Sequence, residues 1–388
     1  MVDLHKEIKL SDLLPKRTSA TKASSGPVEA AKRAPMPPEI VGLKIEAGSL
    51  TAAHVVNNGG KQLVRIVQSP LEPGIVGGGE VRDPAGLATA LNELFSSNDL
   101  PRHGVRLGLA NTRIGVRTIE ITGVTDSQQL ANAVGFRAHE ILSTPLDEAV
   151  LDYRVLGTGE TEEGETVHRV LLVIAFRDSV DRTLAATDAA NLEVEGIDLD
   201  AFALLRASLQ PRAEEAEPES AIVAVSIDHD LTTLAISDGT TCRFTRVLEW
   251  GTANVDNALS RALKLDAEEV PTLRAGLSLE GTSDSSSHSL HGGQQPADIM
   301  RRELQTLVRE LASSIRFYDS QPGATPVAGL IVSGSLVDIP GFVRRLGADL
   351  HLPVSAADPF GRVDLGPDVV RPEGSSGLVV AVGLGIED

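Results

Sequence analysis

The sequence is poor in cysteine and in aromatic residues. It contains one cysteine, Cys242, so no disulfide can form within the chain, and this usage indicates a reducing compartment. Aromatic residues make up 3% of the chain, while 41% is hydrophobic, which indicates a globular core built mainly from Ala, Val and Leu. With 388 residues, the chain is long enough for two or more domains.

Positive charge and long apolar runs are also scarce. The formal net charge is -19, which argues against nucleic acid and anionic membranes as binding partners. No apolar run approaches the ~18 residues that a membrane-spanning helix needs, and residues 171–176 (LLVIAF) have the length of a buried strand. The first residues, MVDLHKEIKL, lack the apolar stretch of a secretory signal. We therefore expect a cytoplasmic protein.

The N-terminal segment predicts a disordered tail over residues 1–39. Residues 16–39 are rich in Pro, Ser, Ala and Lys and are typical of a flexible linker. Residues 4–15 contain a short apolar motif, which is either a frayed terminus or a docking peptide for a groove. The candidate docking residues are Leu10, Leu13, Leu14 and Pro15.

An α/β pattern begins at Ile40. A helix is predicted over residues 84–97, with Asp83 as its cap and Pro84 in its first turn. The predicted strands before residue 210 are 40–45, 51–57, 61–67, 105–109, 114–121, 149–156 and 167–176. Helices are predicted at 126–142 and 178–191, and residues 192–209 read as a strand leading into a helix.

Residues 210–220 (QPRAEEAEPES) form an acidic, proline-bounded linker that marks a domain boundary. Beyond it, residues 221–239 repeat the strand–turn–strand pattern of residues 40–57, and duplicated lobes usually face each other across a ligand cleft. The later predicted elements are helices 252–263, 266–276, 299–318 and one from about 340, and strands 327–332 and 352–355. The serine- and glycine-rich loop 278–298 is predicted to be disordered, with its two histidines solvated.

Six segments, in order along residues 40–360, carry a resemblance to a known family. They are GGGEVRDPAGLATALNELF (77–95), GFRAHEILSTPLDEAVLDYRVL (135–156), GIDLDAFALLRA (196–207), RELASSIRFYDSQ (309–321), LIVSGSLVDIPGF (330–342) and PVSAADPF (353–360). Together they resemble the type IV pilus assembly family PilM, an actin-like relative of the cell-division protein FtsA. The second segment resembles the subdomain that separates this group from actin and sugar kinases.

The resemblance implies the fold class: an α/β, two-lobed actin-like fold (ribonuclease H-like, duplicated) with nucleotide between the lobes and an inserted subdomain of the FtsA/PilM type. The implied division is first lobe 40–121, inserted subdomain 122–191, return to the first lobe 192–212, acidic linker 213–220, second lobe 221–257, small subdomain 258–317, second lobe 318–357 and a closing segment of the first lobe 358–388.

The resemblance also implies a place in the cell and a partner. Members of such families attach to the inner-membrane part of a type IV pilus or of a related secretion machine. Their membrane partner, PilN, offers a short N-terminal cytoplasmic peptide to a groove, and self-assembly into rings or short polymers is possible. Neither nucleic acid nor direct insertion into the membrane is expected.

The first phosphate loop departs from the family pattern, which is approximately D-I-G-S-S-S-V-K. The acid holds magnesium through water, and the glycine lets backbone N–H groups approach phosphate oxygens. Here Lys44 replaces the acid, Glu46 replaces the glycine, and Ser49 is retained. A carboxylate at the phosphate approach opposes binding by a few kcal/mol for unit charges ~4 Å apart.

The other two loops are altered as well. The second loop, D-I-G-A-S-S-T-T in relatives, has Ser226 at the acid and Asp228 at the glycine, and the adenosine loop, S-G-G-G, has lost two glycines. The residues that match nucleotide-binding positions are Lys44, Ser49, Ser226, Thr232, Thr233, Arg274, Glu310, Ser333, Gly334 and Ser335. Ser314 also matches the helix that touches the nucleoside, although such residues are ordinary in helices.

These changes favour a non-catalytic scaffold with a degenerate nucleotide site, without catalytic residues or metal ligands and without a need for ATP and magnesium. An alternative stays open: Lys44 could contact phosphate directly, and Asp228 or Asp230 could hold a metal from shifted positions. The chain would then be an ATP-binding switch or a slow ATPase. A small-molecule kinase on the same fold is disfavoured by the extra subdomain.

Overall fold

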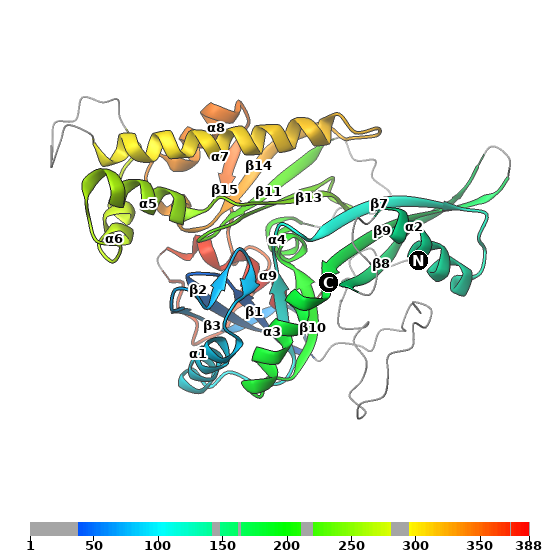
Figure 1. The fold of residues 1–388 in the computed structure, drawn as a ribbon, viewed down its shortest axis with the longest axis horizontal. Coiled ribbons are helices and arrows are strands. Elements are labelled where there is room, and N and C mark those ends of the chain that lie inside the picture. Colours follow the sequence, from blue (N-terminus) through cyan, green and yellow to red (C-terminus); the bar gives the residue numbers. More distant parts are fainter. Residues whose placement is uncertain are drawn as a thin grey trace.

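The structure is a computed structural model that describes residues 38–141, 148–161, 164–210, 220–280, 295–372 and 374–387. Most of the predicted tail, including the apolar motif, lies outside the described residues. The same holds for most of the acidic linker and for most of the serine- and glycine-rich loop. The described residues form two large sheets, a small three-stranded sheet and a two-stranded hairpin (Figure 1).

The first lobe is built on a six-stranded sheet with the order β10-β6-β1-β2-β3-β16. Its strands are β1 (Glu39–Ile45), β2 (Ser49–Val56), β3 (Gln62–Pro70), β6 (Val105–Leu109), β10 (Val194–Leu199) and β16 (Asp364–Leu365). Helices α1 (Pro84–Ser97) and α3 (Arg177–Ala189) pack against each other beside it, and the hairpin of β4 (Val76–Gly77) and β5 (Glu80–Val81) precedes α1. The predicted cap is confirmed, because the Asp83 side chain accepts hydrogen bonds from two backbone N–H groups of the first turn.

The second lobe has a five-stranded sheet with the order β13-β12-β11-β14-β15. Its strands are β11 (Ala221–Ile227), β12 (Thr232–Ser237), β13 (Cys242–Leu248), β14 (Val327–Ser333) and β15 (Val354–Ala356). Its helices are α5 (Thr252–Leu263), α6 (Val270–Ala275), α7 (Pro296–Asp319) and α8 (Phe342–Leu350), and a 3-10 turn, η3, covers Ser335–Asp338.

The two lobes repeat one arrangement of strands. In the first lobe β1 pairs antiparallel with β2 and parallel with β6. In the second lobe β11 pairs antiparallel with β12 and parallel with β14. The duplication predicted from the two strand–turn–strand segments is therefore present in the pairing of the strands.

Helices α4 (Asp200–Ser208) and α9 (Val379–Gly385) lie between the two large sheets, where Figure 1 shows them at the centre of the molecule. A short 3-10 turn, η4 (Ser375–Leu378), leads into α9. Small and aliphatic side chains fill this layer: Ala203, Leu204, Ala207, Ala224, Ala357, Val379, Val380 and Leu384. The two helices approach closely, because a Cβ on Gly383 would lie 2.0 Å from the Ala203 carbonyl oxygen. An apolar layer thus joins the lobes on one side.

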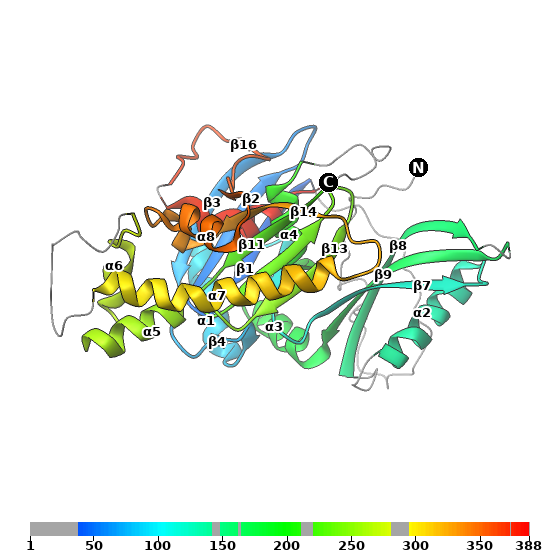
Figure 2. The same ribbon diagram turned by 90° about the horizontal axis from the view of Figure 1, so that it is seen from above.

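The third sheet has the order β7-β9-β8 and extends to one side of the lobes, as the view from above shows (Figure 2). It consists of β7 (Gly115–Thr122), β8 (Ala149–Glu160) and β9 (Thr166–Phe176), with α2 (Ser127–Ile141) packed on one face. The structure differs here from the predicted division at two places. β7, expected in the first lobe, pairs with β9, and α3, expected in the inserted subdomain, packs against α1.

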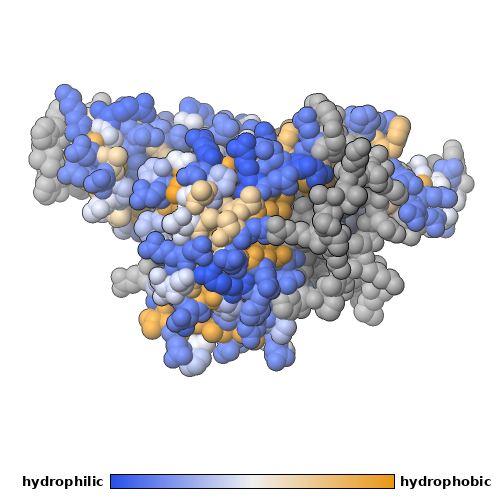
Figure 3. All heavy atoms as spheres, turned by 60° about the horizontal axis from the view of Figure 1, so that its bottom comes forward, coloured by the Kyte–Doolittle hydropathy of each residue, from blue (hydrophilic) through white to orange (hydrophobic). Residues whose placement is uncertain are grey.

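The surface of the molecule is largely hydrophilic on the face that Figure 3 shows. Smaller groups of apolar residues lie among the hydrophilic side chains there. Among the helices that the structure describes, none combines the length and the apolar character required to cross a bilayer.

Candidate functional site at the junction of the lobes

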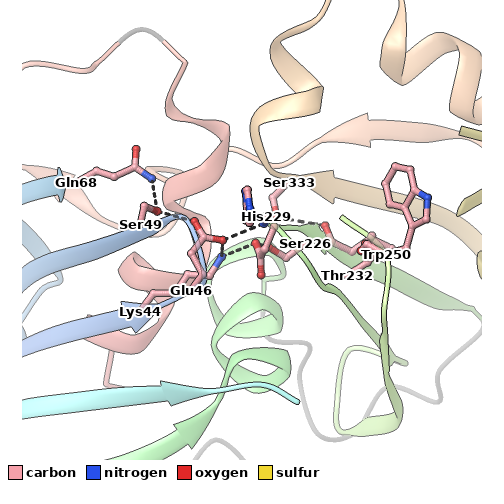
Figure 4. Close-up of polar contacts among 11 residues, drawn as sticks. Lys44, Glu46, Ser49, Gln68, Ser226, His229, Thr232, Trp250 and Ser333 are labelled. Atoms are coloured by element: carbon pink, nitrogen blue, oxygen red, sulfur yellow. Dashed lines mark hydrogen bonds and ion pairs between the residues drawn. The ribbon is translucent and has the colours of Figure 1, made fainter. Parts of the chain in front are cut away.

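The candidate site lies where the carboxyl ends of parallel strands from both lobes meet, the usual place of ligands in α/β sheets. Lys44 is the penultimate residue of β1, and Asp200 follows β10 directly. From the other lobe, Asp228 follows β11 and Ser333 ends β14, which pairs with β11. Figure 4 shows side chains of the two lobes pointing toward one another across this junction.

Lys44 is buried and paired across the junction. Its side chain is 2% exposed, its ammonium group donates to Asp228 Oδ1, and Nζ lies 3.8 Å from Glu46 Oε2 (Figure 4). The Ser226 hydroxyl donates to the same Asp228 oxygen over 2.9 Å. Burial alone would lower the pKa of Lys44, but the charges of Asp228 and Glu46 outweigh it and raise this pKa well above its usual range. Lys44 is therefore a charged ammonium that bridges the two lobes.

Glu46 makes a second contact between the lobes. Its carboxylate accepts the Ser49 hydroxyl over 2.6 Å and the backbone N–H of His229 over 3.3 Å, and Gln68 donates to the Ser49 hydroxyl over 3.2 Å (Figure 4). A Cβ on Gly48 would lie 3.1 Å from the His229 ring, so this glycine permits the close approach of the second lobe. The Glu46 carboxylate, which was expected to repel phosphate, is thus held at the junction by donors from both lobes.

Asp200 is a functional candidate that the sequence analysis missed. It is 4% exposed, and its Oδ1 atom has no hydrogen-bond partner among the described residues. Burial is the main reason that its pKa rises to about 7; the charge of Lys44 opposes the rise, and those of Asp228 and Glu46 add to it. A Cβ on Gly108 would lie 2.2 Å from Oδ1, so a glycine makes room for this carboxyl group. The sequence signal that could have identified Asp200 is an acidic residue directly after a buried parallel strand.

Thr232 of the second loop and Ser333 of the adenosine loop form hydrogen bonds within the second lobe. The Thr232 hydroxyl donates to the Trp250 carbonyl over 2.6 Å, and the Ser333 hydroxyl donates to the Val225 carbonyl over 3.2 Å. Thr233 is buried, and its hydroxyl has no hydrogen-bond partner among the described residues. Gly334 has a φ of 107°, and a Cβ there would lie 2.1 Å from the Ile227 carbonyl oxygen, so the backbone itself requires glycine.

The candidates on the adenosine side form two separate groups. Arg274 pairs with Asp256 over 2.7 Å and donates to the Ser335 hydroxyl over 3.4 Å. Glu310 pairs with Arg246 over 3.5 Å, and Arg246 also donates to the Ser314 hydroxyl over 3.1 Å. The structure therefore brings Lys44, Ser49 and Ser226 together, because all three contact the carboxylates of Glu46 or Asp228. It separately brings Arg274 together with Ser335. The docking motif lies outside the described residues.

Comparison with solved structures shows an actin-like fold, which confirms the fold class predicted from the sequence. One similar structure is MreB 5 of Spiroplasma citri bound to AMPPNP, with 12% identity, coverage of 90% of this chain and 95% of that chain, and a TM-score of 0.50. Another is the ethanolamine utilization protein EutJ from Carboxydothermus hydrogenoformans, with 13% identity, coverage of 90% and 89%, and a TM-score of 0.49.

A third structure has a higher TM-score. It is a PilM–PilN type IV pilus biogenesis complex, matched with 23% identity, coverage of 90% of this chain and 98% of that chain, and a TM-score of 0.75. The family model described as type IV pilus assembly protein PilM matches residues 42–388. The chain belongs to this family, and its role lies in type IV pilus assembly.

Proposed function

We propose that the chain is a scaffold in type IV pilus assembly that docks to the N-terminal cytoplasmic peptide of an inner-membrane protein of the PilN type. It would act on the cytoplasmic side of the inner membrane and reach the membrane through this partner. Family membership supports the proposal, as does the likeness to a complex that contains PilM and PilN. Self-assembly, and a docking role for the apolar motif near the N-terminus, stay predictions.

One observation carries the non-catalytic part of the proposal: the ion pair of Lys44 and Asp228 between the lobes. Magnesium triphosphate would need acids for the metal and backbone N–H groups for the phosphates. Here Lys44 and Ser226 stand at the acid positions, and Asp228 neutralises the ammonium that could attract phosphate. These residues do not fit the nucleotide and its metal.

A second candidate is an ATP-dependent switch, and two observations favour it. A similar actin-like structure, MreB 5 of Spiroplasma citri, is bound to AMPPNP. In this chain, the buried carboxyl group of Asp200 lies at the same junction as Lys44, with a pKa of about 7. An acid with such a pKa could accept a proton near neutral pH. The nucleotide dependence of partner binding separates the two candidates.

The test is a titration of a labelled synthetic peptide, the N-terminal segment of the PilN-type protein of the same organism, followed by fluorescence anisotropy. We expect saturable binding with the same Kd in the absence and presence of magnesium ATP, because the junction closes without nucleotide. A scrambled peptide is the matched control and should not bind. Failure of the native peptide to bind would refute the adapter role, and binding only with magnesium ATP would favour the switch.

A further inference from the structure

Three consecutive residues of the second lobe contact the first lobe. Asp228 accepts the Lys44 ammonium, the backbone N–H of His229 donates to Glu46 over 3.3 Å, and Asp230 accepts the backbone N–H of Gly78 over 2.6 Å. Gly78 is in the turn between β4 and β5, whereas Lys44 and Glu46 are at the end of β1 and in the following turn. A single short loop is thus attached to two separate segments of the first lobe.

Charge explains why the loop is held there. Lys44 is nearly inaccessible, and its ammonium is close to one carboxylate from each lobe, that of Glu46 and that of Asp228. Separating the lobes would give up the attraction between the ammonium and the Asp228 carboxylate, and a partner that stayed buried would be left with an uncompensated charge. The ammonium thereby joins the two lobes through residues of the chain itself.

We propose that the ion pair of Lys44 and Asp228 is a built-in latch, which holds the two lobes closed without a ligand between them. The inference rests on the proposed function in one respect, that no nucleotide is required at this junction. On the other side, the apolar layer of α4 and α9 joins the lobes independently of the latch. Loss of the latch therefore opens the polar side of the junction and leaves the two cores folded.

The experiment measures hydrogen exchange of two backbone amides, those of Gly78 and His229, because both donate across the junction. In the wild-type protein without nucleotide we expect both amides to be protected. In Lys44→Met, which removes the charge and keeps a long side chain, we expect their exchange to become at least about tenfold faster. Amides of the central strands β1 and β11 should keep their protection.

Two further variants make the result interpretable. Arg243→Met is the matched control, because Arg243 pairs with Asp238 inside the second lobe, and it should leave exchange at Gly78 and His229 unchanged. Lys44→Met/Asp228→Ala removes both charges, leaves no large apolar side chain at position 228 to pack across the junction, and avoids an unpaired Asp228 if Lys44→Met fails to fold. It should show the same faster exchange at the junction.

Unchanged exchange at Gly78 and His229 in the folded Lys44 variants would overturn the latch. Protection in the wild-type protein that appears only with magnesium ATP would also overturn it, because the nucleotide would then close the lobes. Protection without nucleotide, combined with saturable binding of ATP in a separate titration, would uphold the latch and refute only the nucleotide-free function. Failure of the latch and failure of the nucleotide-free function therefore give different results.

Discussion

The Asp228→Ala variant is expected to unfold at a clearly lower urea concentration than the wild-type protein, with a loss of about 3–5 kcal/mol in the free energy of unfolding. The reason is that Lys44 would lose its closest partner, so the folded protein would either keep an unpaired charge in the junction or give up the contacts that close it. The Ser226 hydroxyl would lose its acceptor in the same variant. Glu46, 3.8 Å from the Lys44 ammonium, compensates only in part. The measurement is equilibrium unfolding in urea followed by circular dichroism.

The control for this prediction is an ion pair on the surface. Asp298 and Arg301 form an i,i+3 pair on α7, and Asp298 is 44% exposed. Asp298→Ala should therefore cost less than about 1 kcal/mol. An equally small loss for Asp228→Ala would contradict the account, because the junction pair would then contribute no more than a solvated one.

The Asp200→Asn variant is expected to become more stable relative to the wild-type protein as the pH rises from about 4 to 7. The folded-state pKa of Asp200 is about 7, above the ordinary value of 3.8. In this window the unfolded chain releases the Asp200 proton while the folded protein keeps it, so the wild-type protein loses stability as the pH rises. Asparagine stays neutral in both states and removes this loss.

The size of the effect follows from the shift in pKa. One pKa unit corresponds to about 1.36 kcal/mol, so the difference between the two proteins should approach about 4 kcal/mol at pH 7 and change little above it. The measurement is the free energy of unfolding of both proteins at pH values from 4 to 8. A difference that does not vary with pH would show that the pKa of Asp200 is not raised in the folded protein.

Local features of the fold are predictable because their causes lie within a few residues. The sequence around α1 supplies a capping carboxylate, a proline in the first turn and one apolar face, and the helix covers the predicted residues, Pro84–Ser97. The helix predicted at 252–263 likewise matches α5. In both helices the periodicity of the apolar residues is sufficient to predict the element.

The pairing of strands is less predictable because it depends on distant residues. The strand at 114–121 was expected from its local pattern, and β7 occupies nearly the same residues. Its partner is β9, which follows a helix and another strand later in the chain. Alternation along β7 shows that one face is buried, but it does not show against which sheet, and so the strand was placed in the first lobe.

The site was predictable only in part for the same reason. Comparison of the loops singled out Lys44, Glu46 and Asp228 as changed, but the ion pair joins residues 184 positions apart. Taken alone, the ammonium of Lys44 indicated attraction to phosphate, and the two carboxylates indicated repulsion of phosphate. Asp200 was missed because an acid at the start of a helix is common, and its burial and its closeness to Gly108 on β6 depend on residues far away in the sequence.

The central claim is that the junction of the lobes is closed by its own residues and does not take up nucleotide. Isothermal titration calorimetry of the full chain with magnesium ATP tests it most directly. The account predicts no heat beyond that of dilution at protein concentrations in the micromolar range. Saturable one-to-one binding of ATP, abolished by competition with AMPPNP, would contradict it.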